Sequence, residues 1–167
     1  LGASVCSCSP VVCLASQRHR PGPRDGVEPA IRGAHPGGQL GARLKLVGDL
    51  MHKGARLPLT PGDMPMAEAI VVMTEKAFGC LGVVDEDGRL AGIITDGDLR
   101  RNMGNGLLSR RTGEIMTAGP KTVSPELLAS AALEMINSSS ITALFVVEDG
   151  RPVGIIHIHD LLRAGVA

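Results

Sequence analysis

Two stretches of this sequence follow one pattern, GIITDGDLRR at residues 92–101 and GIIHIHDLLR at residues 154–163. In each, an apolar β-branched run ends in a polar residue, and an aspartate follows three positions later. Similar stretches precede both, VVDEDGR at residues 83–89 and VVEDGR at residues 146–151. A third pair, GDLM and GEIM, comes earlier in the same order, and matching positions lie 62 to 65 residues apart throughout. Collinear matches at one spacing indicate an internal repeat.

Composition excludes several classes of protein. The 167 residues carry 17 Lys and Arg against 17 Asp and Glu, whereas a nucleic-acid binder needs a basic excess. Trp and Tyr are absent and Phe occurs twice, so aromatic platforms for stacking bases are not expected. No apolar run approaches the roughly 20 residues that span a bilayer. Three of the four Cys lie near the N-terminus and only Cys80 lies in the patterned part, which favours a reduced, cytoplasmic protein. From charge, aromatic content and hydropathy together, neither a nucleic acid nor a membrane is expected as a partner.

Each repeat predicts the same order of elements, β-α-β-β-α. The predicted strands are residues 57–60, 82–85 and 90–95, then 121–123, 143–147 and 152–156, with Glu-Asp-Gly turns in both hairpins. Helices are predicted from apolar residues at helical spacing, which are Met66, Ala69, Ile70, Met73 and Ala77, then Leu128, Ala131, Ala132 and Met135. The expected N-caps are Asp63 and Ser124, the latter followed by Pro125. Short final helices are expected to begin near Asp96 and Ile158.

The size of the unit predicts how the repeats are arranged. A unit of about 60 residues buries only about 60% of the surface of its unfolded chain, which is marginal for an independent fold. We therefore expect an α/β (α+β) fold in which two β-α-β-β-α repeats pack as a pseudo-twofold pair. The two domains are expected at residues 44–104 and 107–167. The concave seam between them is the expected ligand site.

The polar residues of the repeated stretch are candidate ligand-binding residues. Thr95 ends a predicted strand and Asp98 lies at the start of a helix, so both side chains project toward one spot. The carboxylate can accept hydrogen bonds from ribose hydroxyls, while the Thr hydroxyl and the amides at the helix start can donate to phosphate. The corresponding pair in the second repeat is His157 and Asp160. Alternatively, the aspartates only cap their helices, and His157 either donates to phosphate or blocks the second site.

Two groups of residues invite a metal interpretation. His157 and His159 would share a face on a strand, with Asp160 as a third ligand, but the helix expected to begin here turns the two imidazoles apart. The three early cysteines, together with His19, match no standard zinc-finger spacing. No metal site is therefore predicted.

The repeated stretches resemble CBS domains, the family named after cystathionine β-synthase. The family's hairpin ends in Gly-h-h-[Ser/Thr]-x-x-[Asp/Asn]-h, where h is apolar. Residues 92–99 match at every position, and residues 154–161 depart only at His157, where the family has a hydroxyl residue. The resemblance implies sites for adenine nucleotides and related ligands beside Asp98 and Asp160.

The flanking motifs resemble a narrower family, the arabinose-5-phosphate isomerases of 3-deoxy-D-manno-octulosonate (Kdo) and lipopolysaccharide biosynthesis. These motifs are AHPGGQLG at residues 34–41, GDLMH at 48–52, TDGDLRR at 95–101 and HIHDLLRAG at 157–165. Members interconvert D-ribulose 5-phosphate and D-arabinose 5-phosphate, and a sugar-isomerase (SIS) domain precedes a CBS pair. The resemblance implies one active-site residue here, His35, which can equally be a polar residue in a Gly-Pro turn.

The beginning of the chain does not resemble the SIS domain expected before His35. Its bias toward Gly, Pro, Arg and Cys shows neither helical nor strand periodicity. Residues 1–33 are therefore interpreted as a disordered or mis-framed segment, and residues 34–43 as the end of the SIS domain and a linker. With that catalytic domain missing, the chain is expected to be inactive as an isomerase by itself.

Together these features predict a regulatory, nucleotide-sensing CBS pair that requires no cofactor. The expected ligand is an AMP- or ATP-type nucleotide or CMP-Kdo, the nucleotide sugar of the pathway. The pair is expected to associate into a homodimer or tetramer. Two alternatives remain: a stand-alone adenine-nucleotide-binding CBS module, and an oligomerisation domain with no catalytic role.

Overall fold

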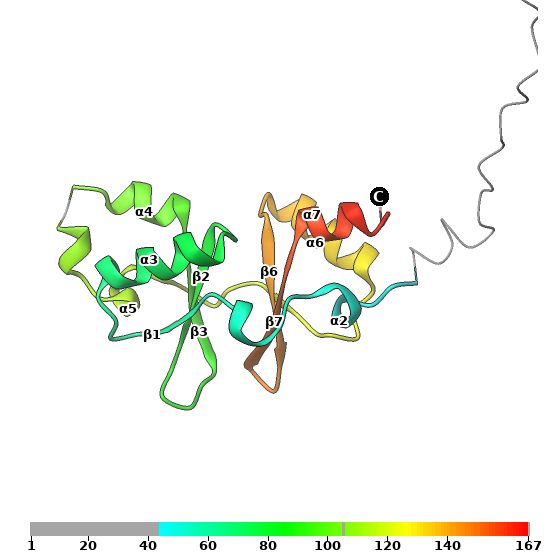
Figure 1. Ribbon diagram of the computed structural model, residues 1–167, viewed down its shortest axis with the longest axis horizontal. Helices are drawn as coiled ribbons and strands as arrows, with labels where there is room; N and C mark the ends of the chain where they lie inside the picture. The colour runs from blue at the N-terminus through cyan, green and yellow to red at the C-terminus, as the bar shows by residue number, and fades with distance from the viewer. Residues whose placement is uncertain (1–43, 105, 167) are drawn as a thin grey trace, which may run out of the picture. The chain divides into compact units, whose positions relative to one another are not determined.

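The structure, a computed structural model, describes residues 44–104 and 106–166 of the chain (Figure 1). The first repeat contains β1 (Leu59–Pro61), α3 (Met66–Lys76), β2 (Cys80–Val84), β3 (Leu90–Thr95) and α4 (Asp96–Asn102). The second contains β5 (Thr122–Val123), α6 (Ala129–Ser139), β6 (Ala143–Glu148), β7 (Arg151–His157) and α7 (Ile158–Arg163). Shorter elements are α2 (Val47–Leu50), η1 (Gly54–Arg56), η2 (Leu107–Ser109), α5 (Thr112–Ile115) and β4 (Thr117–Ala118). The predicted β-α-β-β-α order is confirmed in both repeats.

Each repeat forms one small mixed sheet, which confirms the predicted α/β class. The first sheet has the order β1-β2-β3-β4, with β1 parallel and β3 antiparallel to β2. The second sheet has the order β5-β6-β7 with the same strand directions. The hairpin ladders pair Cys80 with Thr95 and Ala143 with His157. Thr95 and His157 therefore occupy equivalent positions at the ends of their hairpins.

Helices α3 and α6 begin later than the sequence predicts. Their N-caps are Pro65 and Leu128, not Asp63 and Ser124, and neither N-cap makes a side-chain hydrogen bond. The stretch ahead of α6 forms a turn instead, and its Pro125 carbonyl accepts a hydrogen bond of 2.8 Å from the amide of Gly48. A tertiary contact therefore uses backbone groups that the local capping signal would have placed in a helix.

The segment ahead of each repeat packs on the other repeat. Val47 of α2, ahead of the β-α-β-β-α elements of the first repeat, is fully buried in the core of the second. Ile115 of α5, which precedes the second repeat, is buried in the core of the first. Backbone hydrogen bonds fix both segments. The Val47 amide donates to the Leu127 carbonyl and the Thr112 amide to the Met64 carbonyl, each at 2.9 Å. The two repeats therefore exchange their leading segments.

The same leading segments extend the sheets. Thr117 in β4 pairs with Ile93 of β3, so the first sheet gains a strand that the sequence did not predict. His52 makes an isolated antiparallel bridge with Ile155 of β7 at the equivalent place in the second sheet. Thr117 and His52 are thereby delivered next to the ends of the two hairpins.

A third apolar cluster joins the two repeats. Its buried members are Cys80, Ala143, Phe145 and Ile155, and partly buried Leu59, Phe78, Leu90 and Ile93 pack against them. A Cβ atom placed on Gly82 of β2 would lie 2.8 Å from Cζ of Phe145 in β6, so only glycine allows this approach. These contacts confirm that the repeats pack together as a pair.

None of the helices within residues 44–104 and 106–166 is long and apolar enough to cross a membrane.

Candidate functional site

Thr95 and Asp98 meet where strand β3 passes into helix α4. Thr95 is the N-cap of α4, and Asp98 is its third residue. The Asp98 amide donates to Thr95 Oγ1 at 3.4 Å, and the Thr95 amide donates to Asp98 Oδ2 at 2.8 Å. This reciprocal capping box follows directly from the three-residue spacing in the sequence. The structure thus brings the two candidate residues together, as their spacing predicts.

The carboxylate of Asp98 is held by several donors. The residue is only 5% exposed, and Oδ2 also accepts the Thr95 hydroxyl at 2.6 Å. Oδ1 accepts from the Arg101 guanidinium and from the Thr117 hydroxyl at 3.3 Å. Burial raises the pKa of Asp98, but the hydrogen bonds from Thr95 and the charge of Arg101 outweigh it, so the pKa lies below its ordinary value. Asp98 therefore both caps α4 and orients two hydroxyl groups.

Replacing Asp98 with Asn is expected to lower the free energy of unfolding by about 1 kcal/mol at pH 7, because the neutral amide loses the charge-assisted contact with Arg101 and the favourable negative charge in the first turn of α4. Because the pKa in the folded chain lies below the ordinary 3.8, the stability that the carboxylate supplies is present at neutral pH and lost as the pH falls below that value. Urea denaturation between about pH 5 and pH 3 should therefore show a steeper loss for the wild type than for Asp98→Asn. Equal losses would contradict this assignment.

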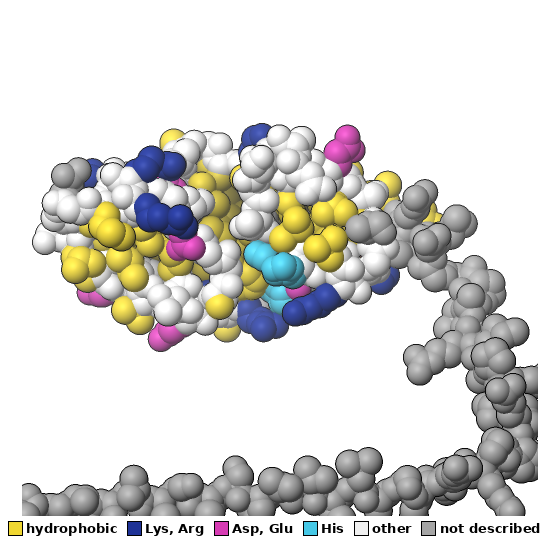
Figure 2. Space-filling view, turned by 90° about the horizontal axis from the view of Figure 1, so that it is seen from above, with side chains coloured by type: hydrophobic (Ala, Val, Ile, Leu, Met, Phe, Trp, Pro, Cys, Tyr) yellow, Lys and Arg dark blue, Asp and Glu magenta, His cyan; other side chains and the backbone are white. Residues whose placement is uncertain are grey.

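A cavity of about 660 Å³ opens beside Thr95, a size typical of small-molecule sites. Both repeats line it, through the ends of β3 and α6, the starts of β2, α4 and β6, and the linker that contains Thr117. In Figure 2 the surface is hollowed between the repeats, with hydrophobic side chains in its depth. Asp98 is not among the residues that line the cavity, but its carboxylate accepts hydrogen bonds from the hydroxyls of Thr95 and Thr117, which do line it. Neither His157 nor Asp160 is among the residues that line this cavity.

The charges of the cavity favour an anion. Its charged lining residues are Arg100 and Lys121, which are basic, and Asp96, which is acidic. Lys121 Nζ donates to Ser139 Oγ at 2.6 Å, which holds the ammonium group at the rim beside the end of α6. Together with the hydroxyl groups, this arrangement can bind a polar ligand that carries phosphate or carboxylate.

Cys80 lines the same cavity and is only 4% exposed. Burial, followed by the negative charge of Asp96, raises the pKa of its thiol to about 12. The thiol is therefore protonated at neutral pH and behaves as a small apolar surface, not as a nucleophile.

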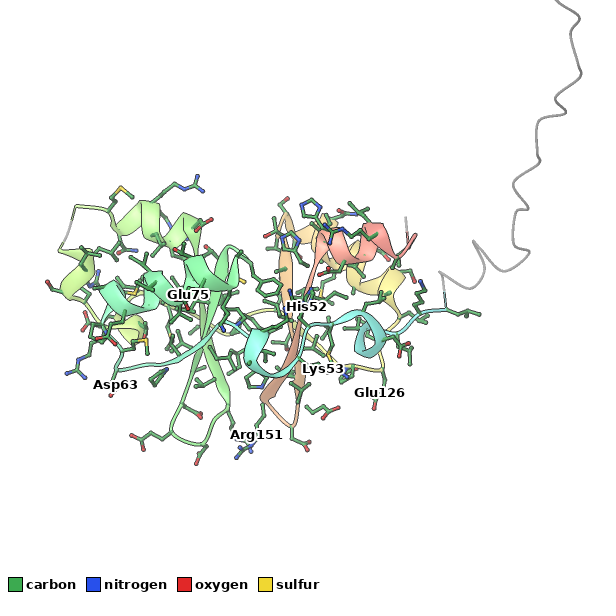
Figure 3. All side chains as sticks on the ribbon, in the orientation of Figure 1. His52, Lys53, Asp63, Glu75, Glu126 and Arg151 are labelled. Carbon is green, nitrogen blue, oxygen red and sulfur yellow. The ribbon has the colours of Figure 1, made fainter. Side chains whose placement is uncertain are left out.

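His157 and Asp160 occupy the equivalent position where β7 passes into α7. His157 is the N-cap, and its amide donates to Asp160 Oδ2 at 3.2 Å. His52 Nε2 lies 3.0 Å from the same oxygen, and Arg56 Nη1 lies 3.2 Å from His52 Nδ1. His52 thus contacts the aspartate of the second position, and Thr117 contacts that of the first, but His52 lies against the oxygen that accepts the strand-end amide whereas Thr117 donates to the other oxygen. Figure 3 labels His52 beside the second repeat.

The imidazoles of His157 and His159 are not turned apart, so that prediction is wrong. Their ring centroids lie 4.9 Å apart with the planes tilted by 34°, and His157 Nδ1 accepts a hydrogen bond of 3.2 Å from the His159 amide. Burial and the nearby His159 and His52 lower the pKa of His157, although Asp160 partly opposes them. Within the part of the chain that the structure describes, no group of three or more His, Cys, Asp and Glu is arranged to hold a metal ion.

The candidate active-site residue His35 and the three early cysteines lie outside the described residues, as do the segments 1–33 and 34–43. The interpretations of these positions stay predictions.

The family model of the CBS domain matches this chain at residues 47–105 and again at residues 113–167. The chain belongs to the CBS domain family. Its CBS pair is also similar to arabinose 5-phosphate isomerase KdsD of Pseudomonas aeruginosa, with 48% identity over 137 residues that cover 80% of this chain and 42% of that protein. The tandem CBS pair and the likeness to arabinose-5-phosphate isomerases are thereby confirmed. The chain spans about two fifths of the length of the curated relatives it matches.

Solved structures of other CBS pairs have the same fold. The CBS domain pair of protein MJ0100, in complex with 5′-methylthioadenosine and S-adenosyl-L-methionine, is 26% identical with a TM-score of 0.64, over 72% of this chain and 94% of that one. The structure of CBSX2 in complex with AMP is 24% identical with a TM-score of 0.64, over 73% of this chain and 96% of that one.

The sequence reasoning proposed only Thr95 among the residues that line the cavity, and it missed Cys80, Arg100, Thr117 and Lys121 among others. One signal was available for Thr117, because it directly follows the repeated GEIM motif as His52 follows GDLM. Nothing local in the sequence joins Thr117 to Asp98 or His52 to Asp160.

Proposed function

We propose that this CBS pair binds a nucleotide and regulates an arabinose-5-phosphate isomerase, which interconverts D-ribulose 5-phosphate and D-arabinose 5-phosphate for Kdo and lipopolysaccharide synthesis in the cytoplasm. The observation that carries the proposal is the cavity of about 660 Å³ beside Thr95, with its two basic side chains and its hydroxyl groups. The 48% identity to KdsD supports the choice of the regulated enzyme. In this proposal the residues of the CBS pair bind the nucleotide that regulates the enzyme.

The chemistry of the cavity suits the parts of a nucleotide. Arg100 and Lys121 can neutralise phosphate. Thr95 Oγ1, whose hydrogen is donated to Asp98, can accept a hydrogen bond from a hydroxyl of the ligand. The Asp98 carboxylate reaches a ribose hydroxyl by releasing Thr117, whose 3.3 Å hydrogen bond is the longest that its oxygens accept. AMP in the CBSX2 structure and adenosine compounds in the MJ0100 structure support an adenine nucleotide. CMP-Kdo offers a ribose and a phosphate of the same kind, with an added carboxylate.

The expected mechanism is allosteric. Thr95 belongs to the first repeat and Thr142 to the second, and both line the cavity, so a bound ligand would tie the repeats together. A ligand that favours one arrangement of the pair biases the catalytic domains attached to it, and substrate must then alter the ligand's affinity by the same factor.

Isothermal titration calorimetry with AMP, ATP and CMP-Kdo tests the binding step. We expect one of the three to bind, and Thr95→Val to weaken it by about tenfold, the loss of roughly 1.4 kcal/mol from one hydrogen bond. Thr74→Val is the matched control, because Thr74 is exposed on α3 and bonds only to the Ile70 carbonyl. Its affinity should equal that of the wild type.

Three outcomes separate the functions. Binding that shifts the KM of an isomerase carrying this pair supports the proposal. Binding with no effect on that enzyme supports a stand-alone nucleotide module instead. If none of the three compounds binds, the proposal fails and an oligomerisation domain is favoured.

The pair is also proposed to associate into a homodimer or tetramer. Helices α3 and α7 leave Val71 56% and Leu162 47% exposed, which is apolar surface that a second copy can cover. Light scattering of the calorimetry samples measures the oligomeric state with and without nucleotide.

A further inference from the structure

The two ligand positions of the pair are built from equivalent residues of different size. His52 follows GDLM as Thr117 follows GEIM, and each bonds to the aspartate of its position. The hairpin ladders make His157 the counterpart of Thr95. Two threonines at the first position are thus replaced by two histidines at the second.

The two positions also differ in the side chain that the opposite repeat contributes, which comes from the residue two positions before the first strand of its hairpin. This residue is Ile141 in the second repeat, where it lines the open cavity, and Phe78 in the first repeat. The Phe78 ring lies against His52, with centroids 5.2 Å apart and the planes tilted by 55°. The second position therefore holds two rings in tilted contact, whereas Thr117 and Ile141 line the open cavity at the first.

His52 is fixed from both sides. Its Nε2 lies 3.0 Å from Asp160 Oδ2, and its Nδ1 lies 3.2 Å from Arg56 Nη1. One neutral tautomer satisfies both contacts, with Nε2–H donating to the carboxylate and Nδ1 accepting from the guanidinium. The side chains of His52 and Asp160 are 23% and 17% exposed, so the contact is partly shielded from water. Figure 2 shows histidines gathered on the surface next to Lys and Arg side chains.

We propose that the second position is a copy of the ligand site closed by His52, so that each chain binds one nucleotide, at the first position. The imidazole lies against Asp160 Oδ2, the oxygen that also accepts the His157 amide, and Phe78 packs against the imidazole, so both rings stand beside the carboxylate that a ribose hydroxyl would approach. A ligand at the first position has to displace only one long hydrogen bond, from Thr117. At the second position it has to separate His52 from Asp160, Arg56 and Phe78 together. This inference rests on the proposed nucleotide binding.

Exchanging residues between the two positions tests the proposal by calorimetric stoichiometry, with AMP, ATP and CMP-Kdo titrated separately. The wild type should bind one ligand per chain. The variant His52→Thr/Phe78→Ile/His157→Thr, which carries the residues of the first position, should bind two. The reciprocal Thr117→His should weaken binding at the first position at least tenfold. Lys53→Thr, at the exposed neighbour of His52, is the matched control and should still bind one.

The outcomes separate this inference from the proposed function. Two ligands on the wild type, or one on the triple variant, overturns the closed position and leaves nucleotide binding intact. His52→Thr alone repeats the test if circular dichroism shows that the triple variant is unfolded. If the wild type binds nothing, nucleotide binding fails, and the contact itself is judged by urea unfolding of His52→Thr, Asp160→Asn and the double variant. Additive effects in that cycle overturn the role of His52.

Discussion

Replacing Phe145 with Ala is expected to lower the free energy of unfolding by about 3–5 kcal/mol. Phe145 is 1% exposed, and it packs in the cluster that joins the two repeats, against Cys80 and Ile155. A Cβ placed on Gly82 would lie 2.8 Å from its Cζ, so the ring packs directly on the backbone of β2, and its removal leaves a cavity between the repeats. Because whole domains are stable by about 5–15 kcal/mol, the loss removes a large share of the total.

Urea denaturation of wild type and Phe145→Ala measures this loss. Leu108→Ala is the control, because Leu108 is 60% exposed in η2 and its truncation should change stability by no more than about 0.5 kcal/mol. Nucleotide affinity should fall with stability, since Ala143 on the same strand lines the cavity. A loss below about 1 kcal/mol would contradict a tightly packed contact between the repeats.

Val47→Asp is expected to destabilise the chain by more than about 4 kcal/mol, because it buries a carboxylate with no partner. Val47 is fully buried among residues of the second repeat, although it precedes the first repeat in the sequence. The damage should therefore begin in the second repeat. Hydrogen exchange should show the amides of β6 and β7 losing protection before those of β2 and β3.

Leu44→Asp is the matched control for this experiment. Leu44 lies three positions earlier and is 69% exposed, so the same charge there should cost no more than about 0.5 kcal/mol. If Val47→Asp exposes β2 and β3 first, the exchange of leading segments is contradicted.

Local interactions explain what could be predicted from the sequence. The hairpins follow from β-branched runs around Glu-Asp-Gly turns, and these runs became β2 with β3 and β6 with β7. Thr95 and Asp98 meet because three residues separate a strand end from the first turn of a helix, and the capping box needs nothing more distant. The same spacing brings His157 and Asp160 together.

The predicted first residues of α3 and α6 were wrong because local sequence patterns carry no information about hydrogen bonds to distant segments. Ser124 followed by Pro125 is a good local cap, but the Pro125 carbonyl is used by the amide of Gly48, 77 residues earlier. A hydrogen bond to a distant segment competes with the helix on equal terms, since either one satisfies the backbone group.

The sequence alone determined the two repeats, their order of elements and the pairing of each strand-end residue with its aspartate, because all of these depend on neighbours a few positions apart. Only the tertiary structure decided that the leading segments exchange, which brings Thr117 to Asp98 and His52, 108 residues away, to Asp160. That exchange depends on which apolar faces bury each other. It places Thr117 beside an open cavity at the first position and the His52 imidazole against Asp160 and Phe78 at the second.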